Sequence, residues 1–405
     1  MTSVLSEAPI VCFANDWLGP PTSKHHIMRH YSAETDVLWI EASGMRRPSL
    51  LRLHDIRRSA DRLRRVLQRP ARTGGADGGV HVRSPFLVPL PGSTTASWIN
   101  GLLLRRTVRR AARSLGWRGP PLLWVYTPTV SAHLDDIPHR GIVYHCVDRW
   151  WAFSEYDAGI MRSHHERMCR IADVVFASSA ALLADCRPLT KRAFLIPHGV
   201  DWEHFSAAAM HPPTPPDDIA DIRGPVIGFF GLLHEWVDLG LVRAVAERFP
   251  AATVVLIGPV RVPLGGLAEL PNVRVLGPRP YEHLPAYCAA FDVALLPFVL
   301  NQLTEAVNPI KLREYLAAGV PTVTTALREL LPLADTPGLH VAASAEDFVE
   351  AVGRRLTGRD ERARRGLATS MAPHSWSARC GEMALEVQRA LRTPPLTPAL
   401  RTFPP

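Results

Sequence analysis

Short apolar runs of strand length alternate with segments of helical periodicity along the whole chain. In the first half the runs cover residues 10–14, 37–41, 80–83, 122–126, 142–147, 174–177 and 193–196. In the second half they cover residues 226–231, 253–257, 273–276, 293–298, 322–325 and 339–342. Apolar strands that alternate with helices are typical of parallel sheets covered by helices on both faces. The pattern therefore predicts an α/β chain with two Rossmann-like domains that face a cleft.

The two predicted domains meet near Val200. The first covers residues 1–200 and the second covers residues 201–392. Residues 393–405 contain too many prolines for a helix and are expected to form a separate tail.

Residues 308–325 carry the signals of one helix followed by one strand. Asn308 is a favourable helix cap, and Pro309 fits the first helical position, where its missing N–H group is not needed. Gly319 is suited to end the helix before the β-branched residues that follow. This stretch therefore predicts a helix whose start is open to a ligand.

Two charged residues on this predicted helix suit the two ends of a nucleotide. The exposed N–H groups of the helix start and the ammonium of Lys311 would attract a diphosphate. Glu314, one turn later, could accept two hydrogen bonds from a ribose diol. An ordinary surface ion pair on an amphipathic helix is the alternative interpretation.

Several motifs resemble those of nucleotide-sugar glycosyltransferases of the GT-B architecture. They are IPHGVDWEHF at 196–205, GFFGLLHEWVDLGLV at 228–242, TVVLIGP at 253–259, the segment 272–298, AAGVPTV after Glu314, and HSWSAR at 374–379. The motifs are similar to the bacterial teichuronic-acid and exopolysaccharide type. The resemblance implies a C-terminal donor site for which we expect Gly231, His234, Gly258, Arg279, Asn308, Lys311 and Glu314.

One position departs from this family pattern. Many retaining members carry a second glutamate eight residues before the ribose glutamate, and Ala306 stands there in this chain. Glu305 is one residue away. Retention of the anomeric configuration is therefore not predicted.

The first half must supply a base, because a sugar hydroxyl has to lose its proton during transfer. Asp148 follows a buried strand and stands beside two tryptophans suited to packing on a sugar ring. A helix cap or an ion pair with a nearby arginine is the competing interpretation of Asp148. His25 and His26, after the first strand, are the next candidates because histidine titrates near neutral pH. Asp16 is a third candidate.

Composition narrows the class of protein. With 405 residues and 47% apolar residues, the chain can bury the cores of two or three domains. No apolar stretch is long enough to span a bilayer, and no secretion signal is visible, so we expect a cytoplasmic protein. Six cysteines stand far apart without a CxxC pair, which predicts reduced thiols and no metal. No cofactor is expected beyond the nucleotide sugar as co-substrate.

The net charge of +8 is concentrated in the first half. Ten arginines stand between Arg46 and Arg72 against two aspartates, and five more stand between Arg105 and Arg113. An anionic membrane surface is the partner that such basic amphipathic segments favour, and solvated helix faces are the alternative. Nucleic acid is not expected, because aromatic residues do not interleave with the arginines.

These observations predict a glycosyltransferase that moves a sugar from a nucleoside-diphosphate sugar to a glycan, lipid-linked or small-molecule acceptor, in cell-surface polysaccharide biosynthesis. Two alternatives stay open. One is a nucleotide-sugar epimerase of the same architecture. The other is a scaffold without catalytic activity in a membrane assembly.

Overall fold

The computed structural model describes residues 8–41, 79–88, 93–356 and 358–392. The chain divides into two compact units. Unit 1 contains the described residues up to Pro197 together with Cys380–Arg392, and unit 2 is His198–Arg379. The arginine-rich segment Arg46–Arg72 and the predicted tail lie outside the described residues.

Unit 1 is built on a seven-stranded parallel sheet with the order β3-β2-β1-β4-β5-β6-β7. Its strands are β1 (Ile10–Ala14), β2 (Val37–Glu41), β3 (Val80–Arg83), β4 (Leu122–Val125), β5 (Gly141–Cys146), β6 (Val174–Ala177) and β7 (Ala193–Leu195). Its helices include α1 (Ser23–Ser32), α3 (Thr94–Ser114), α4 (Ala158–Ile171) and α5 (Ala180–Cys186). All strands are parallel, and the order in which the chain adds strands reverses between β1 and β4. Rossmann-like sheets bind ligands at such a reversal.

Unit 2 repeats this plan with a six-stranded parallel sheet of order β10-β9-β8-β11-β12-β13. Its strands are β8 (Val226–Phe230), β9 (Thr253–Ile257), β10 (Val273–Gly277), β11 (Val293–Leu296), β12 (Thr322–Thr325) and β13 (Leu339–Ala342). Its helices include α6 (Trp202–Met210), α7 (Leu239–Arg248), α8 (Leu284–Ala290), α9 (Ile310–Ala317), α10 (Ala345–Arg355) and α11 (Glu361–Ser370). Every apolar run of the sequence overlaps one of the thirteen described strands of the two sheets. The prediction of two Rossmann-like units is confirmed.

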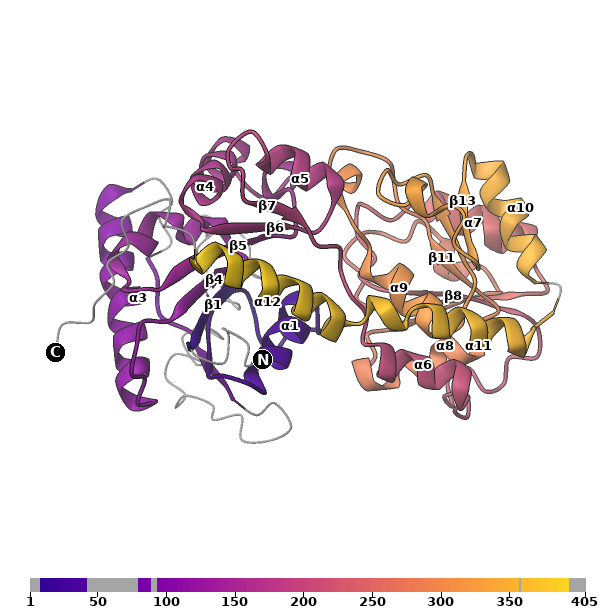
Figure 1. Cartoon of the computed structure of the whole chain (residues 1–405). Helices are drawn as coiled ribbons and strands as arrows, with labels where there is room; N and C mark the ends of the chain where they lie inside the picture. Colours follow the sequence, from indigo (N-terminus) through magenta and orange to yellow (C-terminus); the bar gives the residue numbers. More distant parts are fainter. Residues whose placement is uncertain (1–7, 42–78, 89–92, 357, 393–405) are drawn as a thin grey trace. The chain divides into compact units, whose positions relative to one another are not determined.

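The predicted domain limits are wrong at the C-terminal end. Helix α12 (Trp376–Arg392) begins in unit 2, but the chain from Cys380 onward belongs to unit 1 (Figure 1). The Tyr31 hydroxyl donates a hydrogen bond to the Cys380 carbonyl at 2.9 Å, and Met383 and Val387 are buried. The second unit therefore ends at Arg379. No helix within the described ranges is long and apolar enough to cross a membrane.

Candidate active site

Helix α9 begins and ends in a way that the sequence predicted only in part. Pro309, not Asn308, is the residue that precedes the helix, and the predicted cap is wrong. The Asn308 side-chain oxygen instead accepts a hydrogen bond from buried Arg313 at 2.6 Å. Gly319 ends the helix as predicted, with a φ of +70° that favours glycine. Its N–H donates to the Leu316 carbonyl.

Three chain segments meet at the carboxyl ends of β8 and β9. Gly231 follows β8 and Gly258 follows β9, both with positive φ. A Cβ atom on Gly231 would lie 2.2 Å from Cε of Lys311, and one on Gly258 would lie 1.9 Å from the Gly231 carbonyl oxygen. The two glycines thus allow the β8 and β9 loops to touch and leave room for the Lys311 side chain. This edge is next to the reversal of strand order between β8 and β11.

The charged pair on α9 is strongly affected by its surroundings. Glu314 is only 7% exposed, and burial raises its pKa to about 7 against the opposing effect of Lys311. Burial also lowers the pKa of Lys311, while Glu314 acts in the opposite direction. A surface pair would be solvated, so the ordinary-pair interpretation does not describe this site. Perturbed pKa values of this kind are typical of functional sites.

The loop after β8 presents a histidine to the same edge. The His234 ring stacks on Trp236 with ring centres 4.2 Å apart. Its Nδ1 atom is buried and finds no hydrogen-bond partner among the described residues. In the same loop, Asp238 caps α7 by accepting a hydrogen bond from Leu241 N at 2.9 Å. Among the described residues, His234 therefore carries a buried polar atom whose hydrogen-bonding capacity is unused.

Arg279 has a structural partner that the sequence did not reveal. Its guanidinium donates to the Asp218 carboxylate at 2.7 Å and to the Tyr287 hydroxyl at 3.0 Å. The charge of Arg279 is thus neutralised within unit 2. This ion pair weighs against the expected role of Arg279 in binding a diphosphate.

Ala306 stands where many retaining members of the resembled family carry a second glutamate, and the structure shows its surroundings. Ala306 is buried in a short 3-10 helix (Thr304–Ala306). The neighbouring Glu305 pairs with Arg328 at 2.8 Å. The Glu305 carboxylate therefore forms an ion pair with an exposed arginine.

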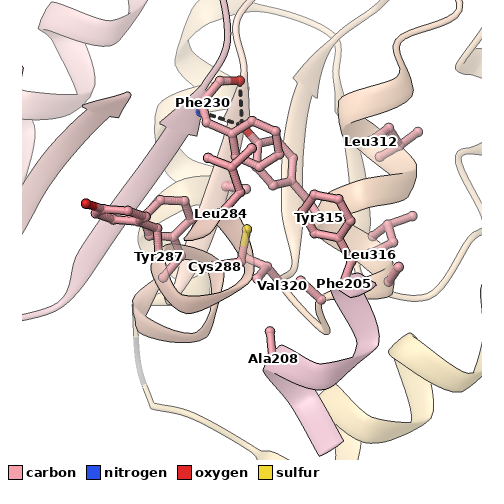
Figure 2. Close-up of a cluster of buried hydrophobic side chains, with 14 of the residues drawn as sticks. Phe205, Ala208, Phe230, Leu284, Tyr287, Cys288, Leu312, Tyr315, Leu316 and Val320 are labelled. Carbon is pink, nitrogen blue, oxygen red and sulfur yellow. Dashed lines mark hydrogen bonds between the residues drawn. The ribbon is translucent and has the colours of Figure 1, made fainter. Parts of the chain in front are cut away.

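Tyr315 connects helix α9 to the end of β8. Its hydroxyl accepts a hydrogen bond from Phe230 N at 2.8 Å and lies 3.4 Å from the Phe230 carbonyl oxygen. Figure 2 shows this contact above the apolar cluster that also contains Phe205 and Leu316. Since Gly231 is the next residue after Phe230, the core of unit 2 fixes the loop that meets Lys311.

In unit 1, Asp148 lies in the loop between β5 and a short 3-10 helix (Trp150–Ala152). Burial raises the pKa of its carboxyl, whereas the Lys24 ammonium lowers it. Lys24 stands at the start of α1. Burial lowers the pKa of Lys24, and the carboxylates of Asp148 and Asp16 act to raise it. No local sequence pattern distinguishes Lys24, although it lies in the same loop-to-helix segment as His25.

The structural roles considered for Asp148 are filled by other residues. Asp157 caps α4 by accepting a hydrogen bond from Ile160 N at 2.9 Å. Arg149 pairs with Asp185 at 3.0 Å. The Arg162 guanidinium lies 5.3 Å from the centre of the Trp151 ring.

His25 is a structural residue, which corrects its proposed role as a base. Its Nδ1 accepts the Thr22 backbone N–H at 3.1 Å, so Nε2 carries the proton and donates to the Asp16 carbonyl at 3.2 Å. The ring is 2% exposed and packs between Trp17 and Trp39. Burial is the main cause that lowers the pKa of His25 to about 4. Both nitrogens are occupied, and no site for a transferred proton is left.

The two remaining candidates differ from His25 in exposure. His26 is partly exposed on α1, and Asp16 is exposed just after β1. The Asp16 carboxylate accepts a hydrogen bond from Leu18 N at 3.3 Å, as in a local turn.

Comparison with known proteins agrees with this architecture. Residues 224–357 match the model of the family described as Glycosyl transferases group 1. A segment of 202 residues is 30% identical to TuaH of Bacillus subtilis strain 168, which is assigned to teichuronic acid biosynthesis as a glycosyltransferase. That match covers 46% of this chain, and the chain spans about half the length of TuaH.

Solved structures match almost the whole chain. Sucrose-phosphate synthase from Thermosynechococcus elongatus has a TM-score of 0.66 at 14% identity, covering 95% of this chain and 99% of that one. HepE of Anabaena, in complex with UDP and glucose, has a TM-score of 0.63 at 16% identity, covering 94% and 99%. At these identities the likeness establishes the fold. The chain has the two-domain GT-B fold, and its residues 224–357 match the glycosyl transferases group 1 family.

Proposed function

We propose that the chain is a glycosyltransferase that moves a sugar from a nucleoside-diphosphate sugar to a hydroxyl acceptor. The observation that carries this proposal is the contact of Lys311 with Gly231, beside buried Glu314, at the strand ends of unit 2. The family match covers this same segment. HepE, which has the same fold, binds UDP and glucose.

Each residue would have a separate part in transfer. Lys311 and the N–H groups at the start of α9 would stabilise the departing diphosphate, and Glu314 would hold the ribose. His234, with its unpartnered Nδ1, would contact the same ligand. Asp148 would take the proton of the acceptor hydroxyl. In this scheme charge stabilisation comes from the protein, and no metal is obligatory in the donor site.

The acceptor and pathway are proposed at a coarser level. Similarity to TuaH supports a role in cell-surface polysaccharide biosynthesis, with a glycan, lipid-linked or small-molecule acceptor. A cytoplasmic protein bound peripherally to the inner face of the plasma membrane would meet such acceptors.

Helix α3 supports the proposed membrane contact. Trp98 and Leu102 are 67% and 45% exposed, and Arg106, Arg110 and Arg113 are exposed further along the same helix. A spacing of four residues places Trp98, Leu102, Arg106 and Arg110 on one face. An apolar half followed by a basic half suits insertion at an anionic lipid surface.

Release of nucleoside diphosphate tests the function directly. With purified chain, nucleotide sugar and candidate acceptors, we expect release only when an acceptor is present. Conversion of the donor without an acceptor would instead identify an epimerase. Binding of nucleotide without any turnover would favour the scaffold.

The donor site is tested by Glu314→Gln. Loss of the charged acceptor should weaken UDP binding by about 1.5–3 kcal/mol in calorimetry. Glu305→Gln, on a residue paired with Arg328, is the matched control and should bind UDP like the wild type. Unchanged affinity of Glu314→Gln would remove the basis of the donor-site assignment.

A further inference from the structure

Three cysteines and one histidine lie together in the core of unit 1, although they are separated in the sequence. Cys146 ends β5, His165 and Cys169 stand one turn apart on α4, and Cys186 ends α5. The cysteine side chains are fully buried, and His165 is 2% exposed. Figure 1 shows α4 and α5 on the same side of the sheet, beside β5, β6 and β7.

The distances in this thiol cluster approach those of a metal site. The sulfur atoms of Cys146 and Cys186 and one ring nitrogen of His165 all lie within 4.8 Å of one another. Sγ of Cys146 is 3.9 Å from Nδ1 of His165, and Sγ of Cys169 is 3.7 Å from Nε2. Bonds of about 2.3 Å to sulfur and about 2.0 Å to nitrogen place neighbouring ligands of tetrahedral zinc about 3.5–3.8 Å apart. Only one ring nitrogen of His165 can bind a given ion. The 3.7 Å contact of Cys169 with Nε2 fits this spacing for an ion on that nitrogen, and the group of Cys146, His165 and Cys186 would contract around it.

The residue types in this cluster and the polar group beside them also fit a metal site. Thiolate and imidazole are the ligands that Zn²⁺ prefers in closed structural sites. The Tyr144 hydroxyl lies 3.0 Å from Nδ1 of His165 and could accept its proton in a hydrogen bond, as partners of metal-bound histidines commonly do. That hydrogen bond would leave Nε2, which faces Cys169, free to bind an ion.

We propose that Cys146, His165 and Cys186, joined by Cys169, bind one Zn²⁺ ion in the core of unit 1. Each cysteine that binds the ion loses its thiol proton to solvent, and no oxidation state changes. The site is structural and separate from the donor chemistry of unit 2.

The ion would brace the loop that carries the candidate base. Sγ of Cys146 lies 3.9 Å from the Asp148 carbonyl oxygen. The Trp151 ring centre is 4.7 Å from that of His165. An ion bound at Cys146 and His165 would therefore fix both ends of the segment from residue 146 to residue 151.

Cobalt substitution tests the site without any assay of sugar transfer. The full chain is produced in zinc-depleted, cobalt-supplied medium, so that the buried site can fill during folding. We expect one ion per chain, with a sulfur-to-cobalt charge-transfer band and the intense visible bands of tetrahedral Co²⁺. The chain produced in zinc-supplied medium should bind one Zn²⁺ and show neither band.

The variants are chosen to separate this site from other thiols. Cys186→Ser and His165→Asn should lower the bound metal at least tenfold, whereas Cys288→Ser changes a buried cysteine of unit 2 and should keep it. The wild-type spectrum decides the case even where a variant fails to fold. Absence of the sulfur-to-cobalt band, its equal loss in Cys288→Ser, or a Cys146–Cys186 disulfide in the purified chain would overturn the proposal.

Discussion

Glu314 carries a pH dependence that its environment explains. Its pKa is raised from an ordinary 4.5 to about 7, mainly by burial. The folded state therefore holds the proton more tightly than the unfolded chain, so this residue's contribution to stability is complete below pH 4.5 and is lost as the pH rises through about 7. In the proposed donor site, ribose binding would need the ionised form, which dominates above that value.

We expect UDP affinity to fall as the pH decreases through 7, by a total close to the loss in Glu314→Gln, because the protonated carboxyl and the amide both lack the charged acceptor. Calorimetry at several pH values with wild type and Glu314→Gln measures this, and the titration of UDP itself is common to both. The variant should lack the part of the slope that Glu314 causes. Identical pH profiles for the two proteins would refute the assignment.

Asp148 is tested by a change that preserves size but prevents proton transfer. Asp148→Asn should lower turnover by about 10² or more, while UDP affinity stays near that of the wild type. Asp135→Asn changes an exposed carboxylate of unit 1 that pairs with Arg167, and it serves as the control. Near-normal turnover of Asp148→Asn would move the base role to His26 or Asp16, since both nitrogens of His25 are hydrogen bonded.

At the scale of elements, α3 makes the membrane proposal measurable. Each basic residue near an anionic surface contributes about 1 kcal/mol, so Arg106→Gln with Arg110→Gln should weaken binding to phosphatidylserine vesicles by roughly 10- to 30-fold at low salt. Trp98→Ser should weaken it further by removing apolar insertion.

The control for α3 removes the same charge elsewhere. Arg362→Gln with Arg365→Gln changes two exposed arginines of α11 and should leave vesicle binding nearly unchanged. Vesicle sedimentation at increasing salt reads both pairs, because screening should weaken binding. Equal binding to neutral and anionic vesicles would exclude this role of α3.

At the scale of the whole molecule, both units place candidate ligand groups at the carboxyl ends of parallel strands. Glycines stand there in unit 2, and Asp16 and Asp148 stand there in unit 1. In each sheet the order reverses at the centre, so loops from neighbouring strands diverge and leave space for a ligand. In the proposed function, sugar transfer needs both units. Acceptor-dependent release of nucleoside diphosphate is therefore the measurement that tests the two units together.

The sequence by itself determined the elements and several residues of the proposed donor site. Strands that are buried on both faces are apolar along their whole length. This pattern can be recognised in the sequence without knowing which strands are neighbours. The strands of both sheets, the stop at Gly319 and the positions of Lys311 and Glu314 followed from such local signals.

Only the tertiary structure decided which groups meet. Lys24 beside Asp148, Arg279 on Asp218, and the cysteine cluster join residues from different elements, and no spacing rule relates them. His25 shows the same limit, because its low pKa depends on burial and on a carbonyl nine residues away. The return of the chain from Cys380 to unit 1 depends on where its apolar face finds a partner. These contacts depend on packing between residues that are far apart in the chain, and no pattern of neighbouring residues predicts them.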